Sequence, residues 1–254
     1  LQVLLAEFPF AAERDRAAAL AAILTAVARP GLRTAPGFLI RAHDLGTGKS
    51  FLAELVALFA APVVEMQRWA QRAEEQDKLL MSLLLEGRQV CVFDNLMRNW
   101  ESPTLAAILT SDHYSDRVLG SSEARRVSTR CLWLATGNNV SAAKDLSRRV
   151  VTIELDAGIE NPLTRRFKGD PVATVRADRG RWIMVALGTL QGARADHLTP
   201  FASFAEWTAT VRSVLVGAGL PDVIGGVVEA VETDDDRATL GFLLETWHGR
   251  FGSE

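Results

Sequence analysis

Short apolar runs that alternate with helical patterns dominate the first 155 residues of the chain. Four of these runs, at 38–40, 90–93, 132–135 and 150–153, are bounded by turn-forming or polar residues and are short enough to be buried strands. The segments 51–60, 67–86 and 102–109 carry patterns that predict helices, the last with Ser102 as N-cap and Pro103 at the first helical position. Alternating strands and helices predict a parallel sheet with helices on both faces.

Helical patterns flank this alternation on both sides. Ala- and Leu-rich residues 11–29 stop at Pro-Gly and predict one helix, and after Leu155 only helical patterns follow. Residues 203–206 match a capping box ahead of an apolar helix face. The acids 234–236 fit the solvated start of a last helix better than a metal site.

These patterns divide the chain into four segments. We expect an N-terminal helical segment at 1–35, an α/β core at 36–156, an α-helical lid at 157–220 and a C-terminal helical segment at 221–254. Because the chain has no starting Met and begins inside a helical pattern, we expect it to be a piece of a longer protein that continues into a further domain.

Composition changes this picture little. The formal net charge of the 254 residues is −3, so a nucleic-acid site would have to be a local patch. The two cysteines, Cys91 and Cys131, lie in apolar runs without a metal-binding spacing, which favours buried thiols in a reducing cytoplasm. No apolar run reaches the roughly 18 residues that a membrane-spanning helix needs, so we expect no membrane partner.

The strongest candidate for chemistry is Gly-Thr-Gly-Lys-Ser at 46–50, between a predicted strand and a predicted helix. The glycines let backbone N–H groups face phosphates, and the helix presents its positive end to the same anion. The Lys49 cation suits the terminal phosphates of ATP, and the Ser50 hydroxyl suits Mg²⁺. His43 stands where the full pattern has Gly, which matters only if that position needs a positive φ. The residues assigned to the ATP phosphates are His43, Asp44, Leu45, Gly46, Thr47, Gly48, Lys49, Ser50 and Phe51.

An acid follows the second apolar run, where a strand aims its carboxylate rigidly. Asp94 is therefore the second candidate for Mg²⁺, bound through the water shell of the metal. Asn95 stands where an acid would orient the attacking water, and an amide is no base. Either Asn95 positions water weakly, or another acid does so, or hydrolysis is slow. Glu74 and Glu75 are outside candidates, although Glu74 has the spacing of a surface pair with Lys78.

Polar residues also follow or precede the last two apolar runs. Asn138, at the end of the third run, can reach the γ-phosphate or the attacking water, and the alternative is a plain turn. Arg148 and Arg149 precede the fourth run. Either could reach the ATP of a neighbouring subunit, where such a group is worth roughly 10³–10⁵ in rate. The alternative is a surface arginine pair.

Residues 117–130 predict two short strands around a Ser-Ser turn. A basic hairpin can follow a nucleic-acid backbone without reading bases, and the alternative is a solvated hairpin. The charged residues in this window are four arginines and one acid: Arg117, Arg125, Arg126, Arg130 and Glu123.

In this order, the segments resemble the AAA+ and superfamily-3-like helicase ATPases of phages, plasmids and integrated elements, which often occur beside a primase. The likeness runs from about residue 8 to about residue 220. Residues 46–50 are specific for P-loop proteins in general, whereas 135–139 and the Arg-Arg before the next strand narrow the field to AAA+ proteins. The segments that carry the likeness are 24–30, 46–50, 93–95, 117–120, 135–139 and 147–150.

The resemblance implies a P-loop NTPase fold of the AAA+ type, with an α-helical lid after the parallel sheet. It implies a homo-oligomeric ring, a hexamer, with ATP and Mg²⁺ between subunits. In such a ring Asn138 would be the sensor, Arg148 or Arg149 the finger, and residues 117–130 the hairpin that grips single-stranded DNA.

We therefore expect an ATPase that works as a DNA helicase in the replication of a mobile element, with a primase module as a candidate partner. Two other classes remain open. A nucleotide-gated assembly or scaffold protein with little hydrolysis is favoured by Asn95. A P-loop small-molecule phosphotransferase is permitted by the helical lid, but it would leave Asn138 and the two arginines without a purpose.

Overall fold

A five-stranded parallel sheet forms the centre of the molecule. The computed structural model describes residues 1–117, 124–158, 168–225, 246–248 and 250. The strands are arranged in the order β2-β3-β6-β1-β7, and each neighbouring pair is parallel. Their bounds are β1 Gly37–Ala42, β2 Met66–Gln67, β3 Val90–Leu96, β6 Leu132–Asn138 and β7 Val150–Leu155.

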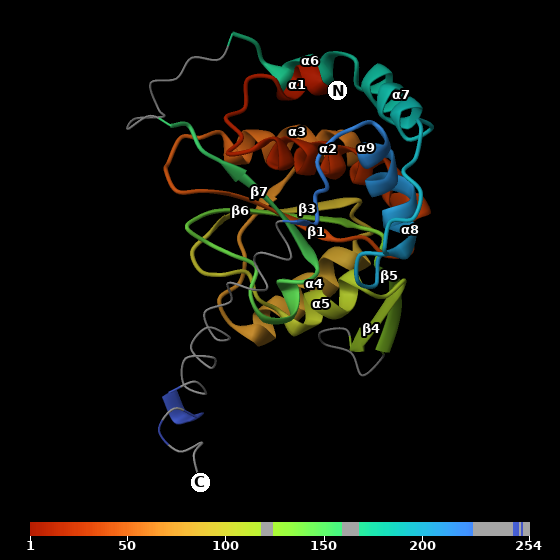
Figure 1. The fold of residues 1–254 in the computed structure, drawn as a ribbon. Coiled ribbons are helices and arrows are strands. Elements are labelled where there is room, and N and C mark those ends of the chain that lie inside the picture. Colours follow the sequence, from red (N-terminus) through yellow and green to blue (C-terminus); the bar gives the residue numbers. More distant parts are fainter. Residues whose placement is uncertain (118–123, 159–167, 226–245, 249, 251–254) are drawn as a thin grey trace.

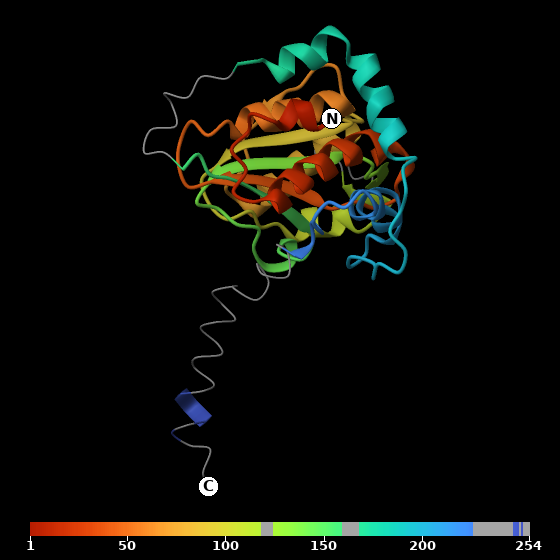
Figure 2. The same ribbon diagram turned by 45° about the horizontal axis from the view of Figure 1, so that its top comes forward.

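Helices cover both faces of this sheet. In Figure 1, α2 (Glu13–Ala28) and α3 (Lys49–Ala60) lie above it, and α4 (Ala73–Leu85) and α5 (Pro103–Leu109) lie below it. Figure 2 shows the strands side by side with α2 crossing in front of them. The mixed α/β arrangement predicted from the sequence is therefore confirmed, and it is consistent with a P-loop-like fold.

The strand order matters for the site because β6 lies between β1 and β3. Residues Ile40 and Ala42 of β1 are paired with Thr136 and Asn138 of β6. On the other side of β6 the register with β3 shifts between Phe93 and Leu96, where β3 takes three steps and β6 takes two. This extra residue is a β-bulge, which re-aims side chains at the end of a strand. The three strand ends thus meet at the carboxyl edge of the sheet.

The core around β3 and β6 is aromatic and close-packed. The Phe93 ring stacks on Trp133 at 6.1 Å and meets the edges of Trp69 at 4.6 Å and Trp100 at 6.4 Å, measured between ring centroids. The expectation of two buried free thiols is confirmed, since Cys91 and Cys131 are buried with their sulfur atoms 3.5 Å apart.

One predicted helix differs from the structure. Residues 67–86 are not one helix, because β2 ends at Gln67 and α4 begins at Ala73. The intervening segment is held by tertiary contacts: the Trp69 ring packs against Phe93, and Gln76 Nε2 donates to the Ala70 carbonyl at 2.9 Å.

Two predicted side-chain contacts are also wrong. The residue that precedes helix α8 (Ala205–Trp207) is Phe204, without a side-chain cap, because Glu206 binds Arg33 in place of closing a capping box. On α4, Lys78 pairs with Glu75 at 2.8 Å, one residue nearer than the expected Glu74.

Helices follow β7 in the described residues, with no strand among them, as predicted. The acids 234–236 lie outside the described residues, and the four segment boundaries remain predictions. No described helix has the length and apolarity needed to cross a membrane. Further helical elements in the described part of the chain are α1 Gln2–Leu5, η1 Arg29–Gly31, η2 Lys144–Leu146, α6 Pro171–Ala177, α7 Arg179–Thr189, the π-helix Thr208–Arg212 and α9 Ser213–Gly217.

A separate antiparallel hairpin lies before β6. Its strands are β4 (His113–Arg117) and β5 (Ala124–Ser128), so two strands are confirmed. The first strand begins four residues earlier than the 117–130 window, and residues 118–123 lie outside the described residues. Because β6 runs away from the hairpin, the hairpin joins the sheet at its amino edge.

Candidate functional site

The 43–50 loop connects β1 to α3 at the carboxyl edge of the sheet. Gly46 and Gly48 have φ values of 77° and 92°, which glycine adopts without the strain a side chain would cause. His43 does not have a positive φ, so its departure from the full Gly pattern carries no backbone strain. Helix α3 starts at Lys49 and directs its N-terminal N–H groups into this loop.

Lys49 is held inside the loop. Its side chain is only 9% exposed, and its Nζ donates to the Asp44 carbonyl at 3.1 Å and to Thr47 Oγ1 at 3.2 Å. Burial lowers the pKa of the Lys49 ammonium, opposed by the nearby carboxylates of Asp94 and Asp44. The loop therefore holds a desolvated cation on a backbone that is already bent.

Ser50 and Asp94 meet although they lie 44 residues apart in the chain. The Ser50 hydroxyl donates to Asp94 Oδ1 at 2.7 Å, which joins the start of α3 to the end of β3. Thr136 of β6 donates to the same Asp94 oxygen at 2.6 Å. Sequence reasoning missed Thr136, because its role depends on which strand lies beside β3.

These oxygens fit a Mg²⁺ ion bound mainly by other ligands. Mg²⁺ in such sites is held by one or two protein oxygens together with phosphates and water. Ser50 and Asp94 supply two hard oxygen atoms at hydrogen-bond distance. Among the described residues no group of three or more His, Cys, Asp or Glu side chains could cage a metal by itself.

Asn95 occupies the bulge beside Asp94 with a left-handed backbone. Its φ is +57°, and its N–H donates to Thr136 Oγ1 at 2.9 Å. Asn is one of the few residues with a side chain that tolerates this conformation, whereas Glu does so poorly. The left-handed backbone is thus a physical reason for Asn, and not an acid, at position 95.

Asn138 ends β6, between the 43–50 loop and the bulge, and Asn139 follows it. Asn138 Oδ1 is buried and makes no hydrogen bond to another described residue, so its amide could still accept a bond there. Asn139 is tied to the loop through His43, whose Nδ1 lies 2.8 Å from Asn139 Oδ1. The other ring nitrogen of His43 lies 3.3 Å from Glu154 Oε1.

A cavity of about 950 Å³ lies beside Asp94 and Asn95. Its walls are residues 66–71, which form β2 and the segment after it, and residues 96–99 with Glu101, which begin at the last residue of β3. From α4 only Gln76 lines it, so Glu74 and Glu75 do not face this cavity.

Arg148 and Arg149 lie at the opposite edge of the sheet, because they precede β7. Both guanidinium groups pair with Asp145 of the same chain, at 2.7 and 3.2 Å respectively. Hydrogen bonds from Arg149, and then from Arg148, lower the pKa of the Asp145 carboxyl. The Arg149 side chain is 17% exposed and also binds the Asp145 carbonyl, whereas Arg148 is 60% exposed. The structure brings neither arginine to the 43–50 loop of its own chain.

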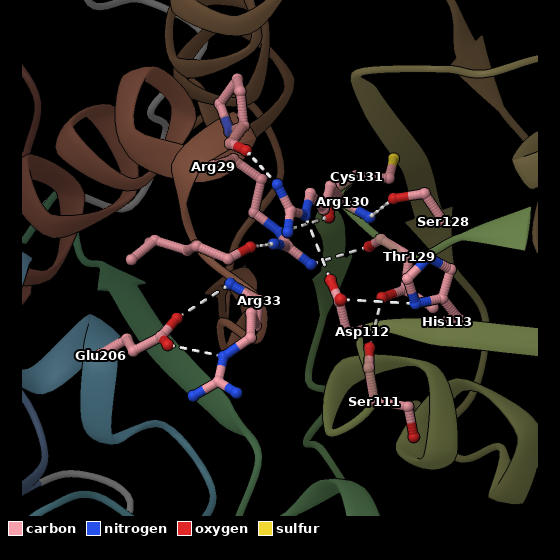
Figure 3. Close-up of polar contacts among 12 residues, drawn as sticks. Arg29, Arg33, Ser111, Asp112, His113, Ser128, Thr129, Arg130, Cys131 and Glu206 are labelled. Carbon is pink, nitrogen blue, oxygen red and sulfur yellow. Dashed lines mark hydrogen bonds and ion pairs between the residues drawn. The ribbon is translucent and has the colours of Figure 1, made fainter.

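The base of the hairpin is built around buried Arg29 (Figure 3). Arg29 donates to three backbone carbonyls, those of Leu32, Thr129 and Cys131, at 2.6 to 3.0 Å. Burial lowers its pKa to about 10, so it stays charged at neutral pH. Next to it, Arg130 binds Asp112 at 3.1 Å and the Pro30 carbonyl at 2.9 Å.

The arginines of the 117–130 window are therefore in different settings. Arg125 and Arg126 lie on β5 and are exposed, whereas Arg130 is fixed at the base. Two acids, Asp112 and Asp116, also belong to this hairpin and its base, so the hairpin is less basic than the window suggested.

The structure thus brings together Lys49, Ser50, Asp94, Asn95 and Asn138 at one edge. No protein-family model matches the chain. No curated protein matches it either.

Similar solved structures share only a general arrangement with this chain. The NrS-1 C-terminal region is 14% identical over 66% of this chain and 40% of that chain, with a TM-score of 0.45. The JCV helicase is 14% identical over 82% of this chain and 62% of that chain, with a TM-score of 0.40. This chain spans about two fifths of the NrS-1 structure. At these scores the likenesses carry no argument about function.

Proposed function

We propose that this chain is a P-loop ATPase core that binds ATP with Mg²⁺ at the carboxyl edge of its sheet. The observation that supports this most directly is the contact between Ser50 and Asp94, 2.7 Å apart, beside a loop that buries Lys49. A hydroxyl at a helix start and a carboxylate at a neighbouring strand end are the protein ligands that such sites offer to Mg²⁺. Bound there, Mg²⁺ would offset the negative charge of the phosphates.

The residues of the chain have separate roles in this proposal. The N–H groups of residues 43–50 bind the phosphates, and the Lys49 cation interacts with the terminal ones. The free Oδ1 of Asn138 accepts a hydrogen bond from the attacking water. Because the Asn95 amide can orient water but cannot take its proton, we propose that hydrolysis by the isolated chain is slow.

We further propose that the site is completed by a second copy of this chain in a ring, with a hexamer as the expected form. Arg148 lies at the amino edge of the sheet, away from the 43–50 loop of its own chain, and is the more exposed arginine of the pair. Its reach toward a neighbouring ATP would offset charge that develops in the transition state. Arg149 holds the turn before β7 in place.

The hairpin gives the motor its proposed substrate, single-stranded DNA. Arg125 and Arg126 are exposed on β5, and Arg117 ends β4 on the opposite strand of the hairpin. Cations on a projecting hairpin bind a phosphate backbone without regard to base sequence. We propose a helicase motor for the replication of a mobile element, with a primase module as its partner.

A second function is favoured by the left-handed backbone of Asn95. This conformation disfavours Glu, the residue that would activate the attacking water. A chain without such a base would bind ATP as an assembly switch and hydrolyse it very slowly. Steady-state phosphate release with and without single-stranded DNA separates the two functions. The motor predicts release that DNA stimulates several-fold and that Lys49→Ala abolishes. The assembly switch predicts ATP-dependent oligomers without DNA-stimulated release.

The DNA contact has its own test. The affinity for single-stranded DNA would be measured against salt for the parent, for Arg125→Ala/Arg126→Ala, and for the control Arg176→Ala/Arg181→Ala on α6 and α7. Each phosphate contact to single-stranded DNA contributes about 0.7 to the logarithmic salt dependence, so losing two should flatten the slope by about 1.4. An unchanged slope in the hairpin variant, equal to that of the control, would remove the link to DNA.

A further inference from the structure

We propose that Thr136 is a positioning residue that sets the Asp94 carboxylate and the Asn95 backbone for binding of Mg²⁺ with a nucleotide. This inference rests on the proposed function, because it concerns the same site. It adds a residue on β6 that neither binds phosphate nor carries charge, and that acts only through Asp94 and Asn95.

The hydroxyl of Thr136 links Asp94 to Asn95, and its role as donor or acceptor is fixed in each of the two hydrogen bonds. It donates its single proton to Asp94 Oδ1 at 2.6 Å and therefore accepts, at 2.9 Å, the N–H of Asn95. Its residue is 1% exposed, so bulk water does not compete for either bond. A hydrogen bond to a charged group in such surroundings is stronger than one between neutral groups.

Such a bond is needed because the sheet ladder is interrupted at this point. Between Phe93 and Leu96 the regular pairing of β3 with β6 is lost to the bulge, which leaves Asp94 and Asn95 without ladder partners in register. The Thr136 side chain takes over this role by bonding the backbone of one residue and the carboxylate of the other. It thereby fixes the direction of Asp94 at the strand end.

The residue after Thr136 strengthens the same arrangement. At Gly137 an added Cβ would lie 2.4 Å from Val140 Cγ2 and 3.2 Å from the Leu96 carbonyl oxygen. The bulged end of β3 therefore packs directly on the bare backbone of β6. Thr136 and Gly137 together fix both sides of the bulge.

Thr136 is also the hydrogen-bond donor to Asp94 that does not itself bind the metal in the proposed site. Ser50 and Thr136 both donate to Asp94 Oδ1, but Ser50 is itself assigned to Mg²⁺. Thr136 has no other assignment in the site. Its hydroxyl is thus the group that keeps the carboxylate oriented whether or not the metal is bound.

The test uses Thr136→Val, which has the same shape but lacks the hydroxyl. A fluorescent ATP analogue would be titrated at a series of Mg²⁺ concentrations, and the Mg²⁺ concentration for half-maximal binding would be read. We expect this concentration to rise about tenfold in Thr136→Val, while binding without Mg²⁺ stays at the parental value. Thr136→Ser, which keeps the hydroxyl, should restore the parental Mg²⁺ dependence.

Thr25→Val is the matched control. Thr25 is also fully buried and also uses its hydroxyl twice, donating to the Ala21 carbonyl and accepting from Trp207 Nε1. It lies on α2, away from Asp94, so its loss should lower stability without changing the Mg²⁺ dependence. This separates a role at the metal from a general loss of a buried hydrogen bond.

Each outcome decides the proposal. If the parent binds the analogue with Mg²⁺ but Thr136→Val and Thr25→Val both keep its Mg²⁺ dependence, the role of Thr136 is overturned and the proposed function stands. If the parent shows no Mg²⁺ dependence, both fall. Should Thr136→Val not fold, Thr136→Cys offers a weaker donor at the same place, and a parental Mg²⁺ dependence in that variant overturns the proposal.

Discussion

At position 95 the backbone selects the residue more strongly than the chemistry of hydrolysis does. Asn95 sits in a bulge with φ +57°, where its side chain costs less than most others. We predict that Asn95→Gly keeps parental stability, whereas Asn95→Glu lowers the free energy of unfolding by about 1–2 kcal/mol. Urea unfolding measures both.

Gln71→Glu is the control for this comparison. Gln71 lines the same cavity as Asn95 and is exposed, but its φ is not positive. The same added charge should therefore change its stability little. Equal losses in the two Glu variants would show that charge, and not the left-handed backbone, disfavours Glu at position 95.

The charge of Lys49 should make ATP binding depend on pH in the alkaline range. Burial disfavours its charged form, so its pKa lies below the ordinary value of 10.5. Binding of ATP needs the charged form of Lys49. The affinity should therefore be highest while Lys49 is protonated and should fall as pH rises through this lowered pKa. We predict a decline that begins at a lower pH than for an unperturbed lysine, measured by equilibrium binding from pH 7 to 10.

Lys49→Arg keeps the charge over the same pH range and should give a flat profile. A parental profile as flat as that of Lys49→Arg would contradict the role given to the desolvated ammonium.

At this scale the sequence predicted what is local and missed what is not. The 43–50 loop is a contiguous turn between a strand and a helix, so its glycines, Lys49 and Ser50 can be read from their order alone. Thr136 could not be found in this way, because its partner Asp94 becomes a neighbour only through the strand order. The left-handed backbone of Asn95 belongs to a bulge that forms only where β3 pairs with β6. The sequence therefore showed only that position 95 lacks an acid.

Among the elements, the hairpin depends on the buried Arg29 at its base. Three backbone carbonyls share this guanidinium, and no described carboxylate pairs with it. We predict that Arg29→Met lowers the free energy of unfolding by at least about 3 kcal/mol, because it leaves buried carbonyls without donors. Thermal or urea unfolding of the whole chain measures this loss.

Arg33→Met is the comparison, since the ion pair of Arg33 with Glu206 is exposed to solvent and should contribute little to the free energy of unfolding. Similar losses in the two variants would mean that the base of the hairpin does not depend on Arg29.

Elements with strong local signals were predicted well, and those set by tertiary contacts were not. Helix α5 begins at the Ser102 cap, whose hydroxyl accepts the Leu105 N–H at 3.1 Å. Residues 68–72 also carry a helical pattern. They are not helical, because Trp69 packs into the aromatic core and holds the segment in another conformation. The 203–206 box failed similarly, because Glu206 binds Arg33 from a distant part of the chain.

At the scale of the whole molecule, the candidate groups divide between two edges of one sheet. Lys49, Ser50 and Asp94 lie at the carboxyl edge, whereas Arg148 and the hairpin lie at the amino edge. The sequence predicted the groups but not this division, which follows from strand direction. A chain arranged in this way needs a neighbour if Arg148 is to reach ATP.

Mixed assemblies test this need. We predict that Arg148→Ala and Lys49→Ala subunits are each inactive alone, and that mixing them restores part of the ATP hydrolysis. Some mixed interfaces then pair an intact loop with an intact arginine. Well-folded subunits that co-assemble without any regained phosphate release would show that the site is not shared.

The central claim, that the carboxyl edge binds ATP with Mg²⁺, is tested most directly by equilibrium binding of a fluorescent ATP analogue to the parent and to Lys49→Ala. Lys78→Ala, on the exposed surface of α4, serves as the control. We predict that Mg²⁺ strengthens binding to the parent and to Lys78→Ala, and that Lys49→Ala loses at least about tenfold in affinity. Parental affinity in a folded Lys49→Ala variant, or binding that Mg²⁺ leaves unchanged, would contradict this account.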